Sequence, residues 1–248
     1  NRDVFVVKLS PEGALDWKVT LDSGAQEWAI AGLDTGSNGV VYVAGSTYGD
    51  LGGSSNHGVR DAFVTALNPQ GQTLWTRLVG GGNYDDPVAL TASPDGSVYV
   101  SGGTYTALGT ATWKGATDGF VSRIGPDGTV LWSQTYGTPD YDTIVSLTPI
   151  PQGDVLAVMS TATLSAGAWT SSYSLMRIDG AGAVVWRQEF PDPISDAAIG
   201  ADGRVYLTGV TTRSANGQAV LGASDIFVTE LDFNRAPGGS IAISGSAR

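Results

Sequence analysis

The sequence predicts an all-β protein, a β-propeller built of four-stranded antiparallel blades. Three observations support this fold: a tandem repeat of about 57 residues, short apolar segments separated by Pro-x-Gly turns, and the lack of any sustained amphipathic helical pattern. Units of four short strands, rich in glycine and aromatic residues, are typical of blades arranged radially around a channel. Four to five blades are therefore expected from a chain of this length.

The first repeated motif reads Asp-x-Phe-Val, then a Pro-x-Gly turn, then Leu-Trp or a close variant. It occurs at residues 3–17, 61–75 and 118–132, in a weaker form at 172–186, and its first half returns at 225–232. The repeat tryptophans are spaced by 58, 57 and 54 residues, at Trp17, Trp75, Trp132 and Trp186. Each copy predicts one β-hairpin, and we expect these tryptophans to be largely buried between blades.

A second motif, of the type Gly-x-Val-Tyr-Val-x-Gly, alternates with the first. Its copies lie at residues 38–47, 95–104, 153–162 and 202–211, each after a short apolar stretch. This motif predicts a second hairpin per repeat. With the strands of a blade named A to D from the channel outward, it supplies strands A and B, and the tryptophan motif supplies C and D. Residues 225–231 are then expected to pair as 61–67 do.

The strand order predicts a single propeller domain over residues 1–235, with repeat units at 3–60, 61–117, 118–171 and 172–224 and a partial unit at 225–235. Residues 236–248 form a C-terminal tail or the last outer strand, which we expect at 240–244. Counted along the chain, the strands are C-D, three complete A-B-C-D blades, and A-B-C. Two arrangements remain open: a ring of five or more blades that lacks an A–B hairpin, or a four-bladed ring with spare strands at its ends.

Composition excludes several classes of function. The 248 residues include 13 Lys and Arg, 24 Asp and Glu, one His and no Cys, which gives a formal net charge of −11. This balance argues against a nucleic-acid partner, because phosphate binding requires a basic surface. No apolar run approaches the roughly 20 residues of a membrane-spanning helix, so membrane insertion is not expected. A thiolate nucleophile, a disulfide and a multi-histidine metal site are also excluded.

Candidate binding residues lie in the longer loops, because the D–A and B–C connections share one face of a propeller and the Pro-x-Gly turns share the other. These candidates are Trp28, Tyr84, Asp85, Trp113, Tyr141, Asp142 and Trp169. Aromatic faces beside carboxylates suit sugar rings. Grouped carboxylates suit Ca²⁺, for which the weaker candidates are Asp85, Asp86, Asp140 and Asp142. Asp61, Asp118 and Asp225 share one repeat position, which favours a structural hydrogen bond there.

Catalysis is not expected. His57 could act as a general base with the nearby Asp61 as its orienting group, but no nucleophile motif accompanies this pair. Asp85 and Asp142 on adjacent blades leave open a carboxylate-based glycoside hydrolase or lyase. Passive binding by the same residues requires fewer assumptions.

The pieces Asp-Ala-Phe-Val, Asn-Pro-x-Gly-x-x-Leu-Trp and Asp-Gly-x-Val-Tyr-Val-x-Gly resemble the bacterial SBBP-type β-propeller repeat, from Asp3 to about Asp232. The third repeat departs from this pattern at residues 172–174, 156–157 and 159. The resemblance implies a secreted or cell-surface protein, or a periplasmic one, within a larger assembly and without catalytic residues. Our first hypothesis is thus a non-catalytic protein-interaction or structural subunit, with a glycan-binding module as the alternative. No cofactor is expected other than Ca²⁺.

Overall fold

A computed structural model of the chain describes residues 2–109, 111–151, 153–212 and 224–231. Within these ranges the backbone forms strands, turns and irregular segments, without a helix. The described part accordingly contains no helix suited to crossing a lipid bilayer. The all-β prediction is confirmed.

In the described residues, seventeen strands form five antiparallel sheets, which we call blades 1 to 5 in chain order. Blade 1 contains β1 (Val4–Leu9) and β2 (Leu15–Leu21). Blade 2 contains β3 (Glu27–Thr35), β4 (Val41–Thr47), β5 (Asp61–Leu67) and β6 (Thr73–Val79). Blade 3 contains β7 (Asp85–Ala92), β8 (Val98–Thr104), β9 (Asp118–Ile124) and β10 (Val130–Tyr136). Blade 4 contains β11 (Tyr141–Pro149), β12 (Val155–Ser165), β13 (Ala168–Ile178) and β14 (Val184–Phe190), and blade 5 contains β15 (Ile194–Ile199), β16 (Val205–Thr211) and β17 (Asp225–Leu231).

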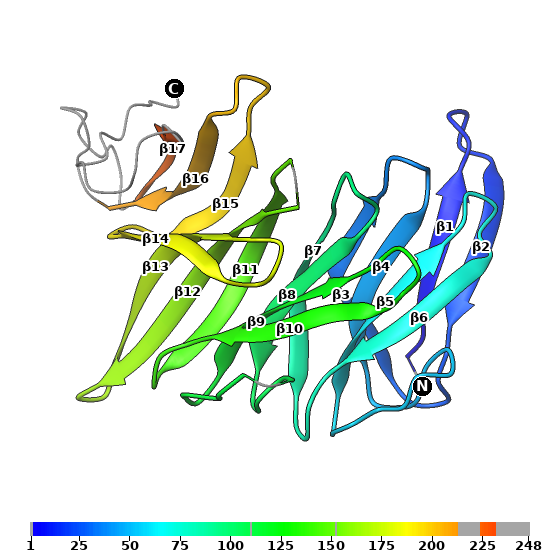
Figure 1. Ribbon diagram of the computed structural model, residues 1–248, viewed down its shortest axis with the longest axis horizontal. Coiled ribbons are helices and arrows are strands. Elements are labelled where there is room, and N and C mark those ends of the chain that lie inside the picture. The colour runs from blue at the N-terminus through cyan, green and yellow to red at the C-terminus, as the bar shows by residue number, and fades with distance from the viewer. Residues whose placement is uncertain (1, 110, 152, 213–223, 232–248) are drawn as a thin grey trace.

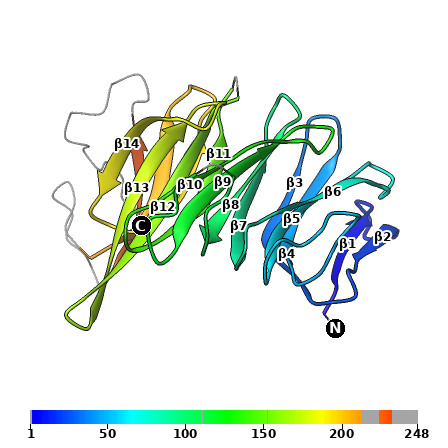
Figure 2. The ribbon, with the colours of Figure 1, turned by 60° about the horizontal axis from the view of Figure 1, so that its bottom comes forward.

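The blades stand side by side in a curved row, as Figures 1 and 2 show, with blade 1 and blade 5 at opposite ends. Within each blade the strands pair in chain order as a simple meander. The A strands of successive blades contact one another, β3 with β7, β7 with β11, and β11 with β15. The described residues therefore form an open succession of propeller blades rather than a closed ring.

The predicted strand order is confirmed by the sheets: a C–D pair, three complete blades, then strands A, B and C. β17 pairs with β16 in the expected register, because Thr211 is opposite Asp225 just as Thr47 is opposite Asp61. The outer strand expected at 240–244 lies outside the described residues.

The core lies between blades, and one phenylalanine position shows how it is built. Phe63, Phe120 and Phe227 occupy the same place in the C strands of blades 2, 3 and 5, and are 0%, 0% and 4% exposed. A Cβ added to Gly45 would lie 2.8 Å from the ring of Phe63, and one added to Gly209 would lie equally close to Phe227. Glycine on the B strand therefore leaves room for the ring, which packs against the preceding blade.

The repeat tryptophans link each blade to the next. The indole N–H groups of Trp17, Trp75 and Trp132 donate to carbonyl oxygens in the C–D turn of the following blade, at Pro69 (3.0 Å), Pro126 (2.9 Å) and Gly180 (2.9 Å). Their side chains are half-buried rather than largely buried as predicted. The reason is that the D strand is the outermost strand, so one side of each indole faces solvent.

A second set of links comes from tyrosines on the B strands. The hydroxyl of Tyr42 donates to the carbonyl of Gly96 (3.0 Å), and that of Tyr99 donates to the carbonyl of Gly153, each in the A–B turn of the next blade. Burial raises the pKa of Tyr99 to about 12, so the hydroxyl stays protonated as a donor. Leu156 takes this position in blade 4, and the junction with blade 5 has no such hydroxyl.

Candidate functional site

The candidate site is the face on which A and C strands begin and B and D strands end. Antiparallel pairing places these ends together: Glu27 is opposite Thr47, and Thr47 is opposite Asp61. The same arrangement recurs in blades 3 and 4, so the longer loops gather on this face. We call it the loop face.

An acidic residue at or next to the start of the A strand in blades 2, 3 and 4 accepts a hydrogen bond from the threonine opposite it on the B strand. The hydroxyl-to-carboxylate distances are 2.9 Å for Thr47 and Glu27, 2.5 Å for Thr104 and Asp85, and 2.5 Å for Thr161 and Asp142. All three acidic residues are buried. The shared position and shared partner indicate that these carboxylates fix the loops of each blade.

Asp85 and Asp142, two of the predicted binding residues, are therefore enclosed by their own loops. Their second oxygens accept backbone N–H groups, from Gly81 at 2.8 Å and from Thr138 at 2.6 Å. Both side chains are 0% exposed. A ligand that approaches from solvent meets neither carboxylate.

A second acidic position begins the C strands of blades 2 and 3 and completes a carboxylate pair where blade 2 meets blade 3 and where blade 3 meets blade 4. Asp61 and Asp118 are buried and accept backbone N–H groups from His57 (2.8 Å) and Lys114 (2.9 Å). The structural hydrogen bond predicted for this position is thus present in blades 2 and 3. One oxygen of each, Oδ1, is buried without a hydrogen-bond partner in the described structure.

Burial dominates the electrostatics of these pairs. It raises the pKa of Asp85 to about 6; hydrogen bonds from Thr104 and Gly81 lower it, and the charge of Asp61 raises it further. Burial likewise raises the pKa of Asp61 and of Asp118, and the charge of Asp142 adds to the rise at Asp118.

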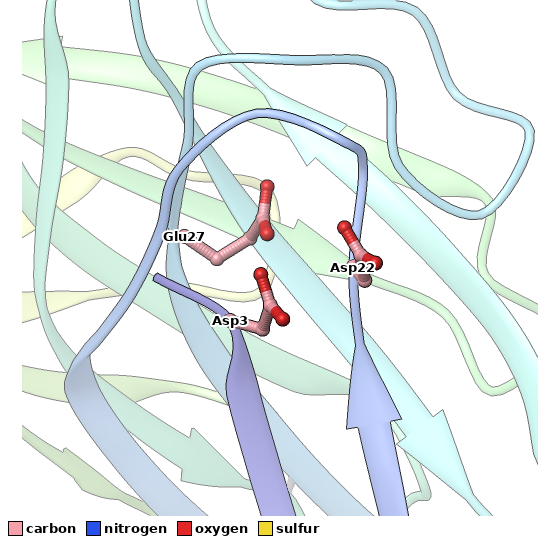
Figure 3. Close-up of side chains that lie close together, drawn as sticks. All are labelled: Asp3, Asp22 and Glu27. Carbon is pink, nitrogen blue, oxygen red and sulfur yellow. The ribbon is translucent and has the colours of Figure 1, made fainter. Parts of the chain in front are cut away.

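The other predicted metal ligands are also engaged elsewhere. Asp86 forms an ion pair with Arg60, and Asp140 accepts a hydrogen bond from the hydroxyl of Thr163 at 2.8 Å. Within the described ranges, three carboxylates come within 4.8 Å of one another at one place, and that group consists of Asp3, Asp22 and Glu27. Figure 3 shows the three side chains facing one another at the junction of blades 1 and 2.

Sequence reasoning missed this group, although two of its members follow the repeat. Asp3 corresponds to Asp61 at the start of a C strand, and Glu27 corresponds to Asp85 at the start of an A strand. Asp22 has no acidic counterpart, because glycine follows the D strand in blades 2 and 3. Alignment of the repeats at this position would have revealed it.

The predicted aromatic residues are more accessible than the carboxylates. Tyr84, Trp113, Tyr141 and Trp169 are 37%, 45%, 43% and 58% exposed. Tyr141 and Trp169 form an edge-to-face pair with ring centroids 5.3 Å apart, and Tyr84 forms a similar pair with Tyr105 at 6.2 Å.

Trp169 lies in a strand, whereas the sequence reasoning placed it in a loop. β12 and β13 pair without interruption as far as Ser165 and Ala168, and residues 163–172 project beyond the pairs made by β11 and β14. Gly167 closes the hairpin at a φ of 81°, which favours glycine. The projecting hairpin presents Trp169 near its tip.

Trp28 and His57, the other two residues singled out from the sequence, each contact a neighbouring charged side chain. Trp28 is half-buried, and the guanidinium of Arg2 lies over its ring at 4.3 Å. The ring of His57 is exposed, with Nδ1 at 3.3 Å from Asp61 Oδ2. Both residues of the expected base–orienter pair therefore lie in contact, but one carboxylate oxygen of Asp61 also accepts the backbone N–H of His57.

No protein-family model matches the chain, so the SBBP-type resemblance stays a prediction. Among curated proteins, the regulatory protein FlaEY of Caulobacter vibrioides is 31% identical over 158 residues, which cover 57% of this chain and 16% of that protein. The chain thus spans about a sixth of the length of this distant relative.

Solved structures with related architecture include a protein of unknown function from Bacteroides caccae, with a TM-score of 0.48 and 12% identity over 95% of this chain and 71% of that one. Streptogramin B lyase has a TM-score of 0.35 and 14% identity, over 82% and 68%. BamB from Moraxella catarrhalis has a TM-score of 0.26 and 14% identity, over 82% and 75%.

Proposed function

We propose that the chain is a non-catalytic structural and interaction module, placed at the cell surface or outside the cell, whose blade 1 packs against a further propeller blade of the same repeat type. One observation carries this proposal. Blade 1 exposes apolar residues at the positions where the other blades bury them.

Phe5 is 62% exposed, whereas Phe63 and Phe120, at the same repeat position, are 0% exposed. Leu9 is 55% exposed, whereas Leu67 is 0% exposed. In blades 2 and 3 the preceding blade covers these side chains. The face of β1 that carries Phe5, Val7 and Leu9 therefore has the composition of an inter-blade surface, and exposed apolar patches of this kind favour association.

The C–D turn of blade 1 supports the same partner. A Cβ added to Gly71 or Gly128 would lie 2.6 Å or 2.8 Å from the indole of the preceding blade, because Trp17 and Trp75 pack on these glycines. Gly13 occupies the same turn position with a φ of +86°, but no described atom lies within 4 Å of its added Cβ. The turn of blade 1 thus has open space at Gly13, where an indole from a further blade could pack.

The inner edge of β1 supports a further hairpin. β5, β9 and β17 each pair with a B strand, whereas the described residues pair β1 with β2 alone. An apolar strand with an unpaired edge readily accepts another strand. The edge of β1 therefore suits pairing with an added A–B hairpin, and the exposed face of β1 suits packing against a complete blade that precedes this hairpin.

The proposed absence of catalysis and the proposed location outside the cytoplasm have separate grounds. The carboxylates that a glycoside hydrolase would need, Asp85 and Asp142, are buried and hydrogen-bonded within their own loops. The extracellular or cell-surface location, with the periplasm as the alternative, rests on the resemblance to SBBP-type repeats.

A repeat duplication tests the proposal. Residues 22–117, joined in front of Asp3, supply a complete blade and an A–B hairpin in the correct frame, because Thr117 naturally precedes Asp118. In this extended chain, Phe5→Ala should lower the melting temperature and the hydrogen-exchange protection of β1 about as much as Phe120→Ala does. In the original chain it should change neither. A neutral Phe5→Ala in both chains would refute the proposal.

A second candidate function is glycan binding, favoured by the exposed pair formed by Tyr141 at the start of β11 and Trp169 on the projecting hairpin. Rings of this kind stack on the CH faces of sugars. A glycan array, followed by titration of intrinsic fluorescence, should identify a ligand whose binding Trp169→Ala abolishes. Trp113→Ala, which removes an exposed tryptophan elsewhere on the loop face, should leave that binding unchanged. Equal effects of the two variants would count against a defined sugar site.

A further inference from the structure

The carboxylates of Asp3, Asp22 and Glu27 meet where blade 1 joins blade 2. Asp3 directly precedes β1, Asp22 directly follows β2, and Glu27 is the first residue of β3. One oxygen from each carboxylate lies within 4.8 Å of the other two. Figure 3 shows that the three side chains come from separate segments and point toward a common space.

Glu27 is the buried member of the group and carries an unsatisfied oxygen. Its side chain is 2% exposed. Oε1 accepts hydrogen bonds from the hydroxyls of Thr47 and Ser23, whereas Oε2 is buried with no hydrogen-bond partner among the described residues. A buried carboxylate oxygen without a partner is unfavourable, and a cation would satisfy it.

The described cations do not neutralise the group. No described Lys, Arg or His nitrogen forms an ion pair with Asp3, Asp22 or Glu27. Arg2, the adjacent basic residue, places its guanidinium over the ring of Trp28. Three negative charges thus lie close together without a protein counter-charge in the described structure.

The other junctions show that the third carboxylate is a departure from the repeat. Gly80 and Gly137 take the place of Asp22, and a Cβ added to either would lie 2.3 Å from an atom of the Asp61 or Asp118 carboxylate. A side chain is therefore excluded there, and those junctions hold two carboxylates each. Only at this described junction does an acidic side chain replace the glycine.

We propose that Asp3, Asp22 and Glu27 bind a Ca²⁺ ion that ties blade 1 to blade 2. All three donors are carboxylate oxygens, the ligands that Ca²⁺ prefers. Ligands about 2.4 Å from a calcium ion are separated by at most about 4.8 Å, and one oxygen of each of the three carboxylates lies within that separation of the other two. Asp3 and Asp22 are exposed, so water completes the coordination sphere from the solvent side.

The ion connects the two residues that flank the β1–β2 hairpin to the start of β3. Because blade 1 has two strands in the described structure and an exposed apolar face, this hairpin is held by fewer contacts than the C–D pairs of the complete blades. Ca²⁺ bound at this junction stabilises the hairpin and orients its face. This inference stands independently of whether a further blade packs there.

Isothermal titration of the full chain with CaCl₂, after removal of metal with EDTA, tests the site directly. We expect one binding event and a higher melting temperature in Ca²⁺, with a weaker response to Mg²⁺, which requires a stricter octahedral geometry. Tb³⁺ should bind in place of Ca²⁺ and show luminescence sensitised by Trp28, the residue next to Glu27. No binding heat and no melting shift at millimolar Ca²⁺ would overturn the proposal.

Two variants separate a specific site from general charge effects. Asp22→Gly introduces the residue that follows the D strand in blades 2 and 3, so it should fold normally and weaken Ca²⁺ binding by at least about tenfold. Asp85→Asn removes the corresponding A-strand carboxylate one junction further on and should leave Ca²⁺ affinity unchanged. Wild-type affinity in Asp22→Gly, or an equal loss in Asp85→Asn, would refute the assignment. Glu27→Gln should abolish the Tb³⁺ signal.

Discussion

Replacement of Phe120 by alanine should lower the free energy of unfolding by about 3–5 kcal/mol. Phe120 is 0% exposed and packs against Ala62, Val64 and Ala66 of the preceding blade. A buried phenylalanine removes roughly 150–250 Å² from water, which at about 25 cal/mol per Å² corresponds to about 4–6 kcal/mol before the remaining alanine is subtracted. These small neighbours sit on a paired strand and cannot move to fill the cavity.

Phe5→Ala is the matched control, because it changes the same residue type at the same repeat position. Phe5 is 62% exposed, so its loss should change the free energy of unfolding by no more than about 0.5 kcal/mol. Both variants can be compared by urea denaturation followed by tryptophan fluorescence and circular dichroism. Equal shifts of the two midpoints, or a Phe120→Ala midpoint within error of wild type, would show that inter-blade burial does not stabilise the chain.

Trp75→Phe should cost about 1 kcal/mol in urea denaturation, because it keeps a ring but removes the hydrogen bond to the Pro126 carbonyl; a neutral result would assign no net stability to that link. Gly128→Ala should destabilise more than Gly203→Ala in thermal denaturation, since both have positive φ, but only the Gly128 Cβ would lie 2.8 Å from Trp75; equal losses would leave backbone strain as the sole effect. Asp85 has a folded-state pKa of about 6, above the ordinary value of about 3.9. Folding therefore favours the protonated acid. The contribution of Asp85 to the free energy of unfolding should fall as the pH rises from about 4 to about 6, by on the order of 3 kcal/mol, and should stay constant above about pH 6. Asp85→Asn should make the overall decline in stability over this range smaller, because the raised pKa values of Asp61 and Asp118 still contribute to it, and an unchanged pH profile would contradict the raised pKa of Asp85.

The blade structure could be predicted from sequence because its determinants are local. Pro-x-Gly turns, apolar alternation and the tryptophan spacing each act within one hairpin, and the predicted strand order agrees with the sheets. The incomplete first blade was also visible in the strand count. The half-buried state of Trp75 was not, because it depends on the position of the D strand at the rim of the blade.

The site was harder to predict because its residues act across the chain. Asp85 and Thr104 are 19 residues apart, and only their opposition across two strands shows that the carboxylate holds its own blade together. Asp3 and Glu27 meet through the junction of two blades. A threonine at or near the end of the motif is present in every copy of the second motif, and its partner became clear only from the register.

The tryptophan link from one blade to the turn of the next also has a genetic consequence. Each link uses residues of two adjacent repeats only, as Trp75 with Pro126 and Trp132 with Gly180 illustrate. An in-frame recombination between equivalent codons of two repeats therefore adds or deletes a whole blade and leaves every remaining link with a matching partner. Gene length can vary in steps of one repeat, and the residues that tolerate such steps least are those, like Asp22, that depart from the repeat.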